Sequence, residues 1–197
     1  MNNILRACIP LLLIFSVTTY AADNQGKYSI HGAGLLKCNI FVDERKKQSP
    51  AYMMIGGWID GYISAVNQLE KNTYDITSFT STELLTALID KHCAGHPDDV
   101  LAPVLSAILT KLHADRVKTA SPLVIVRVGK FQTQLYKKTL ADIQKKLAHK
   151  KYFNKEANGV WSKSLQTALL KYQQSANLKP TGFPDQKTLW HLFRSKP

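Results

Sequence analysis

The stretch NGVWSKSLQTALLKYQQSANLKPTGFPDQKTL, residues 158–189, predicts a turn, a helix, a tight loop and a second helix. Asn158 and Gly159 form a turn dipeptide, because both residues tolerate positive φ angles. Ser162 is a good N-cap residue, so a helix should begin just after it. The apolar residues that follow recur at the spacing of an amphipathic helix: Leu165, Ala168, Leu169, Tyr172 and Ala176.

The end of this helix and the start of the next are also marked in the sequence. Asn177 stands where a left-handed residue commonly ends a helix. Three helix-breaking residues follow it: Pro180, Gly182 and Pro184. Asp185 can then cap a short last helix. That helix would carry Leu189, Leu192 and Phe193.

In order and spacing this stretch resembles the peptidoglycan-binding domain of the three-helix type, which is found beside many cell-wall hydrolases. The positions that match the pattern of this family are Gly159, Trp161, Ala168, Leu169, Tyr172, Gln173, Leu178, Thr181, Gly182, Asp185, Thr188 and Leu189. Upstream, the residues that resemble its first helix are Leu140, Ile143, Leu147 and Tyr152. Four positions depart from the pattern: Asn158, Ser162, Leu165 and Asn177. They affect ligand contacts more than the fold.

The resemblance implies a binding edge formed by the two turns on either side of the central helix. The expected peptidoglycan-binding residues are Asn158, Gly159, Trp161, Gln173, Thr181, Gly182, Asp185, Lys155 and Lys163. Gln173 and Asp185 would supply hydrogen bonds, and the lysines would attract wall carboxylates. Trp161 could equally be a core residue. For Leu169 and Tyr172 we favour the core.

Residues 1–22 predict a secretory signal peptide. They contain a lone Arg6, an apolar run over residues 9–17 and small residues at Ala21 and Ala22. The apolar run is too short to span a membrane, so we expect no stable membrane anchor. We therefore expect export, with the periplasm as the location.

The cysteine count fits an oxidising compartment. Removing the signal peptide removes Cys8 and leaves Cys38 and Cys93. An even pair outside the cytoplasm is most simply one disulfide. In the chain-entropy model, closing such a loop would stabilise the fold by about 4 kcal/mol.

The charge of the chain is divided unevenly. Residues 116–197 contain 17 Lys and Arg against 3 Asp and Glu, whereas residues 23–115 contain 8 against 11. This split suggests two units, of which the basic one faces an anionic partner. In an exported protein, wall carboxylates or anionic lipids fit better than nucleic acid. A solvated lysine surface is the alternative.

Residues 23–118 predict a small helical bundle. The expected helices cover residues 35–47, 51–69, 80–93 and 97–112. A capping box of Thr80 and Glu83 would open the third helix. In the second helix, each glycine costs about 1 kcal/mol relative to alanine. We therefore expect Gly56, Gly57 and Gly61 to allow close contact with a neighbouring helix, and Trp58 to lie in the core.

The bundle has a resemblance of its own. The residues that carry it are Cys38, Phe41, Gly57, Trp58, Gly61, Tyr62, Cys93 and Pro97. They look like the periplasmic acid-stress chaperones of the HdeA/HdeB type, and they are also similar to Rap1a/Tai immunity proteins. The first likeness implies apolar surface that is exposed when carboxylates become protonated. The second implies one dedicated protein partner. Both alternatives stay open.

Residues 119–134 predict a connector with a short strand. The run LVIVRV, residues 123–128, is rich in β-branched residues, and Gly129 ends it. It could lie against the C-terminal unit, residues 135–197, or act as a rigid spacer. The segment 130–138 mixes lysines with aromatic residues, but its amphipathic pattern is too short to favour a membrane surface.

No residue set in the sequence predicts catalysis. His92, Cys93 and His96 could in principle hold zinc. Cys93, however, has a partner in Cys38, and no further Cys, His or acidic residue completes a recognisable ligand set. Paired carboxylates for glycan cleavage, an H-E-x-x-H motif, a G-x-S-x-G motif and a phosphate loop are not found. We expect no catalytic residues, no metal and no cofactor.

These observations predict a mainly α protein, in which a disulfide-stapled small helical bundle precedes a three-helix peptidoglycan-binding domain. The expected function is a non-catalytic exported protein that binds peptidoglycan through its C-terminal domain and contacts one or more proteins through its bundle. The alternative is a peptidoglycan hydrolase with an unrecognised catalytic site in the N-terminal domain.

Overall fold

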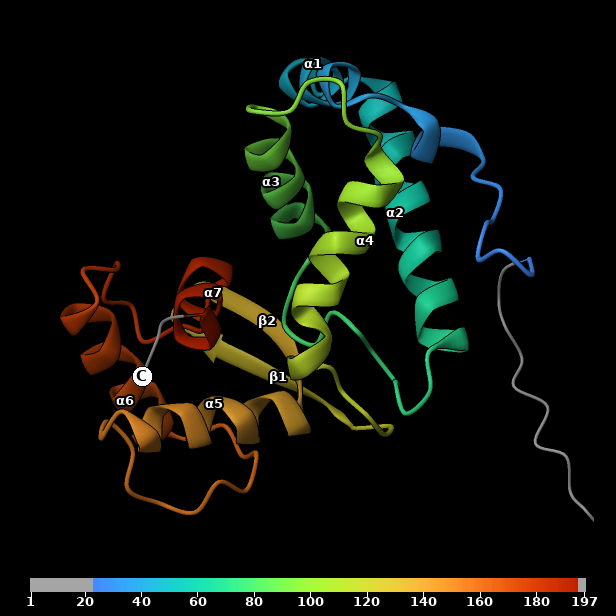
Figure 1. Ribbon diagram of the computed structural model, residues 1–197. Helices are drawn as coiled ribbons and strands as arrows, with labels where there is room; N and C mark the ends of the chain where they lie inside the picture. Colours follow the sequence, from blue (N-terminus) through green and yellow to red (C-terminus); the bar gives the residue numbers. More distant parts are fainter. Residues whose placement is uncertain (1–22, 195–197) are drawn as a thin grey trace, which may run out of the picture.

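The computed structural model describes residues 23–194, which form two mainly helical lobes (Figure 1). The upper lobe contains α1 (Cys38–Lys47), α2 (Pro50–Leu69), α3 (Thr82–Cys93) and α4 (Leu101–Leu112). Short 3-10 turns at Gly32–Leu35 and His113–Asp115 flank these helices. The lower lobe contains β1 (Leu123–Val128), β2 (Phe131–Tyr136), α5 (Lys137–His149), α6 (Lys163–Ser175) and α7 (Gln186–Arg194). The expected signal peptide lies outside the described residues.

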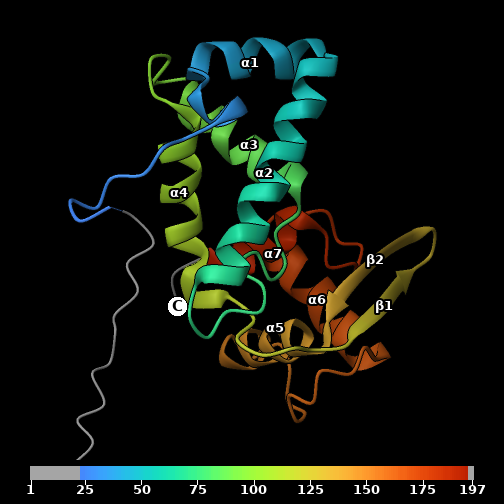
Figure 2. The same cartoon turned by 90° about the vertical axis from the view of Figure 1, so that its right-hand side faces the viewer.

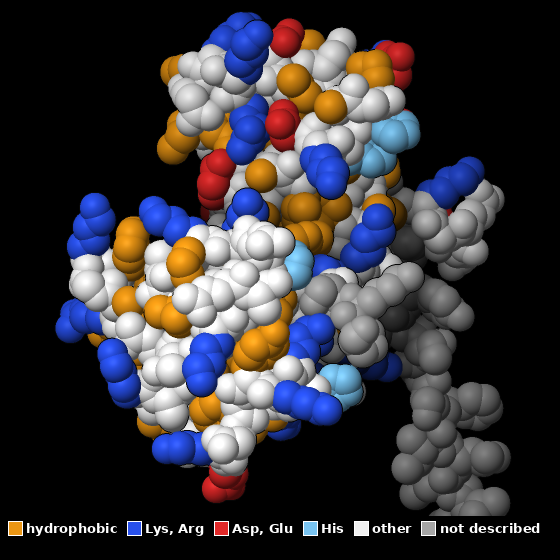
Figure 3. All heavy atoms as spheres, turned by 90° about the vertical axis from the view of Figure 1, so that its left-hand side faces the viewer, with side chains coloured by type: hydrophobic (Ala, Val, Ile, Leu, Met, Phe, Trp, Pro, Cys, Tyr) orange, Lys and Arg blue, Asp and Glu red, His pale blue; other side chains and the backbone are white. Residues whose placement is uncertain are grey.

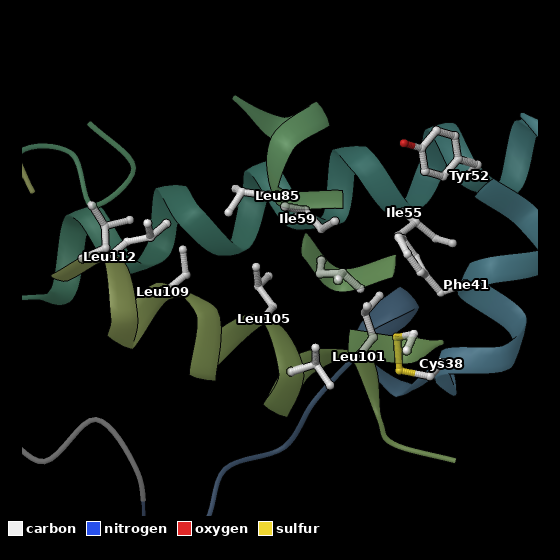
Figure 4. Close-up of a cluster of buried hydrophobic side chains, with 14 residues drawn as sticks. Cys38, Phe41, Tyr52, Ile55, Ile59, Leu85, Leu101, Leu105, Leu109 and Leu112 are labelled. Atoms are coloured by element: carbon white, nitrogen blue, oxygen red, sulfur yellow. A yellow bond between two sulfur atoms is a disulfide. The ribbon is translucent and has the colours of Figure 1, made fainter. Parts of the chain in front are cut away.

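The core of the upper lobe is built from one face of each of its four helices (Figure 4). Its fully buried side chains include Phe41, Ile55, Ile59, Leu85, Ile89, Leu101 and Leu105. The disulfide between Cys38 and Cys93 lies in this core and joins the start of α1 to the end of α3. The predicted disulfide-stapled bundle is therefore confirmed.

Three expected helix starts in the bundle are wrong. The first helix begins at Cys38 rather than at residue 35, because Gly32–Leu35 form a 3-10 turn. The N-cap of α3 is Ser81, whose Oγ accepts a hydrogen bond from the backbone N–H of Leu84 at 3.2 Å. Glu83 has no capping role there, and its carboxylate instead accepts hydrogen bonds from Arg45 at 2.8 Å and from Tyr52 at 3.2 Å. The fourth helix begins at residue 101 rather than 97, because the preceding turn hydrogen-bonds to the first residues of α1.

The glycines of α2 do not have the expected role. A Cβ atom at Gly56, Gly57 or Gly61 would meet no atom within 4 Å apart from its own helix backbone and chain neighbours. The close approach is at Gly34, where a Cβ would come within 3.0 Å of the Trp58 ring. The indole N–H of that tryptophan donates to a backbone carbonyl at 2.9 Å, and its ring packs against the core, as expected.

The predicted strand pairs with a second strand that the sequence analysis missed. β1 and β2 form an antiparallel hairpin with Val128 opposite Phe131, and Gly129 takes φ +55° in the turn (Figure 2). Val126 and Leu135 are buried in the core of the lower lobe. The hairpin therefore packs on the C-terminal unit. Among residues 23–194, no helix has the length and apolarity that a membrane span requires.

The two lobes meet through a packed junction. Phe79, from the segment before α3, is 3% exposed and lies in the core of the lower lobe. Its ring centroid is 4.4 Å from that of Phe193 on α7. Gln186 donates to the carbonyl oxygen of Phe79 at 2.8 Å, and Arg194 forms an ion pair with Asp115. The lobes therefore share buried surface.

The junction also contains a tyrosine with a raised pKa. Burial raises the pKa of Tyr136 to about 12, and the nearby Asp75 carboxylate adds to the effect. Above pH 10 the folded state therefore keeps a proton that the unfolded state loses, so the free energy of unfolding falls as the pH rises towards 12.

We expect Tyr136→Phe to make this alkaline loss of stability shallower. Urea denaturation of both proteins across that pH window measures it. Below pH 10 the difference in unfolding free energy between the wild type and Tyr136→Phe should not depend on pH. Two parallel curves throughout would contradict the prediction.

Candidate functional site

Two glycine turns lead into the last two helices of the lower lobe. Gly159 precedes α6 and Gly182 precedes α7, with φ of +73° and +68°. A Cβ atom would come within 3.0 Å of the carbonyl oxygen of Lys137 at the first turn, and of Cγ of Gln166 at the second. The backbone therefore requires glycine at both positions. Both residues are buried, so they shape the loops from inside.

Each turn is held by a buried glutamine of the preceding helix. Gln144 on α5 accepts a hydrogen bond from the N–H of Gly159 at 2.8 Å and donates to the carbonyl of the next residue at 3.1 Å. Gln173 on α6 accepts a hydrogen bond from the N–H of Gly182 at 2.7 Å and donates one to the carbonyl oxygen of Phe183 at 2.8 Å. The same helix, glutamine and glycine-turn arrangement thus occurs twice.

This geometry corrects the expected role of Gln173. Its side chain is 0% exposed, and its amide also donates to Thr188 Oγ1 at 3.0 Å. Because its polar atoms are used inside the domain, it holds the Thr181–Gly182 loop in place and does not face a ligand. Gln144 has the equivalent role and was missed. The signal for it in the sequence is a glutamine on the apolar face of its helix.

The predicted helix ends are confirmed. Ser162 Oγ accepts from the N–H of Leu165 at 3.3 Å at the start of α6, and Asn177 takes φ +54° just after its end. At α7 the two carboxylate oxygens of Asp185 accept from the N–H and the hydroxyl of Thr188, both at 2.8 Å. The carboxylate of Asp185 therefore serves as a helix cap.

The first half of the expected site surrounds the Asn158 turn. Asn158 is exposed, and its Oδ1 accepts from the N–H of Val160 at 3.0 Å. Trp161 is half-buried against the core of the lower lobe, whereas Lys155 and Lys163 are exposed. This turn rests on the start of α5, while the second glycine turn rests on α6. The two halves of the expected site therefore rest on different helices.

The second half of the expected site borders a hollow of about 330 Å³ beside the hairpin. Thr181 and Asp185 line it, together with two aromatic residues that the sequence analysis did not assign to a site, Phe131 and Phe183. The ring centroids of these aromatics lie 5.6 Å apart, and Phe131 is 39% exposed. The hollow therefore offers apolar ring surface to a ligand.

Basic side chains accompany these rings. Lys179 and Lys187 line the same hollow, and the ammonium group of Lys130 lies 5.8 Å from the ring centroid of Phe131. On the face of the lower lobe that Figure 3 shows, Lys and Arg side chains are frequent and acidic side chains are sparse. Such a site suits a ligand that has an apolar face and negative charges.

Comparison with known proteins identifies the lower lobe. Residues 137–192, from the start of α5 into α7, match the family model described as "Putative peptidoglycan binding domain". No curated protein and no solved structure matches the chain. The expected C-terminal peptidoglycan-binding domain is thereby confirmed. The likeness of the bundle to acid-stress chaperones or immunity proteins stays a prediction.

Proposed function

We propose that this protein is exported to the periplasm, binds peptidoglycan without cleaving it, and presents its helical bundle to other proteins. The observation that carries the proposal is the hollow lined by Phe131 and Phe183 on a domain of the peptidoglycan-binding type. Sugar rings of the glycan have apolar faces that can lie on aromatic rings. Carboxylates of the stem peptides would be attracted by Lys179 and Lys187.

The proposed lack of catalysis is supported by the state of the cysteines. Cys38 and Cys93 are bonded to each other, so neither is a free thiolate for nucleophilic attack. In the C-terminal unit, the carboxylate of Asp185 caps α7. A glycoside hydrolase of the usual type would need a pair of carboxylates on opposite sides of the scissile bond.

The proposed protein contacts of the bundle are supported by apolar side chains on α2. Met53 is 71% exposed and Met54 is 76% exposed, both near the start of the helix. Leu69, at the other end of the same helix, is 68% exposed. Methionine adapts its shape to different partners and is common on binding surfaces. These exposed side chains at the two ends of α2 can therefore contact other proteins.

We expect Phe131→Ala to weaken co-sedimentation of the full chain with purified sacculi by about tenfold, which is the loss of about 1.4 kcal/mol. Ile125→Ala is the matched control, because Ile125 is an exposed apolar residue on the other strand of the hairpin. Binding should also weaken as salt is added. No soluble wall fragments should appear in the supernatant.

The variant Trp161→Ala separates the two halves of the site. If it loses binding and Phe131→Ala does not, the ligand lies at the Asn158 turn instead of the hollow. Unchanged binding of both variants would remove both surfaces from the site. Release of soluble muropeptides by the wild-type protein would replace the binding proposal with a hydrolase.

A further inference from the structure

The turn between α3 and α4 brings together three side chains that the function proposed above does not use. His92 lies in the last turn of α3, His96 follows that helix, and Asp99 precedes α4. One donor atom from each of the three lies within 4.8 Å of the other two. In the sequence the two histidines stand with Cys93, and no further residue there completes a recognisable ligand set. The disulfide excludes that cysteine, and the fold supplies the aspartate in its place.

The backbone that carries these residues is fixed at several points. Within the turn, the N–H of His96 bonds to the carbonyl of Cys93 at 3.2 Å, and the N–H of Asp99 bonds to the carbonyl of His96 at 3.2 Å. Across to α1, the N–H of Cys38 bonds to the carbonyl of Asp99 at 2.8 Å. The disulfide anchors the turn at Cys93. The three donors are therefore held near one another before any ligand arrives.

The hydrogen bonds of the two imidazoles suit metal binding. His96 Nδ1 lies 3.0 Å from the carbonyl oxygen of His92. A carbonyl only accepts hydrogen bonds, so Nδ1 carries the hydrogen and Nε2 keeps its lone pair. A contact of this kind commonly orients a metal-binding histidine. His92 Nε2 lies 2.8 Å from Asp99 Oδ2, where an ion can replace the shared hydrogen.

We propose that His92, His96 and Asp99 bind a divalent transition-metal ion, with Zn²⁺ as the reference ion. With bonds of about 2.0–2.1 Å, two ligands of a tetrahedral ion lie about 3.3 Å apart. The distance of 2.8 Å between His92 Nε2 and Asp99 Oδ2 is close to this spacing. The other donor atoms, which lie within 4.8 Å of these, must move closer where they exceed it. Water would complete the coordination. Two imidazoles and one carboxylate favour Zn²⁺, Cu²⁺ or Ni²⁺ over Mg²⁺ or Ca²⁺.

The side chains have room to make this adjustment. The rings of His92 and His96 are stacked with centroids 4.4 Å apart, so one ring must turn to aim its lone pair at the ion. His96 is exposed, and the side chains of His92 and Asp99 are 38% and 49% exposed. His92 and Asp99 also line a hollow of about 760 Å³ between α3, α4 and Trp190. The ion can therefore enter from solvent.

Calorimetric titration of the untagged full chain with zinc chloride tests the site. We expect one binding event with a micromolar dissociation constant, weakened at least tenfold by His96→Ala and by Asp99→Asn. His149→Ala is the matched control, because that histidine is exposed on α5, far along the chain from the turn. It should leave binding unchanged.

A second measurement follows the thermal midpoint, since an ion that binds only the folded state raises it. Zinc should raise the midpoint of the wild type and of His149→Ala, but not that of His96→Ala. Absence of binding by the wild type would overturn the proposal. So would wild-type affinity in both His96→Ala and Asp99→Asn.

Discussion

Replacing Phe79 with alanine is expected to lower the free energy of unfolding of the whole protein by about 3–5 kcal/mol, the usual cost of removing a buried phenylalanine ring. Phe79 belongs by sequence to the bundle, in the segment before α3, yet its ring lies in the core of the lower lobe. It contacts the ring of Phe193 on α7. The substitution would therefore leave a cavity in the C-terminal domain.

The neighbours of Phe79 explain why this cavity should not close easily. The ammonium group of Lys146 lies 4.9 Å from the ring centroid of Phe193. Gln186 bonds both to the carbonyl of Phe79 and, at 3.0 Å, to the N–H of Ser81. These contacts hold α7 and the segment before α3 at a fixed separation. The surrounding side chains therefore have little freedom to fill the lost volume.

Urea denaturation followed by tryptophan fluorescence measures this effect, because Trp58 packs against the core of the bundle, Trp161 against that of the lower lobe, and Trp190 against both. Phe131→Ala is the matched control. It removes the same ring from an exposed position on the hairpin, so it should cost under about 1 kcal/mol. We expect both lobes of Phe79→Ala to unfold at lower urea than in the wild type. Equal unfolding free energies for the two variants would contradict the prediction.

The local structure of the last two helices could be predicted from the sequence, because it depends on residues that are near in the chain. Ser162 and Asp185 cap helices by bonding to groups three residues away. Asn177 and Gly159 take positive φ at the positions where turn chemistry favours them. Because such contacts join residues that are close in the chain, the local sequence predicts them without knowledge of the tertiary structure.

What could not be predicted depends on contacts between distant segments. The strand Phe131–Tyr136 alternates weakly and becomes a strand by pairing with Leu123–Val128. Gln144 is polar, and its burial makes sense only once the turn at Gly159 lies beside it. The aromatic wall of the hollow joins Phe131 to a loop far along the chain. Each depends on elements that meet only in the assembled fold.

The other large effect is expected at the first glycine turn, where Gly159→Ala should lower the free energy of unfolding by about 2–5 kcal/mol. Alanine at φ +73° costs about 1–2 kcal/mol for the left-handed backbone alone. The new Cβ would also approach the carbonyl oxygen of Lys137 within 3.0 Å. The turn must then move off the start of α5, which weakens the hydrogen bonds from Gln144.

The control for this prediction is Gly129→Ala in the hairpin turn. Gly129 also has positive φ, at +55°, but a Cβ there would meet nothing within 4 Å. It should therefore show the backbone cost alone, about 1–2 kcal/mol. The difference between the two variants in urea denaturation measures the steric contact with α5. Equal losses of unfolding free energy in Gly159→Ala and Gly129→Ala would contradict the prediction. The turn could then shift away from α5 at no cost, and Gln144 would not hold it in place.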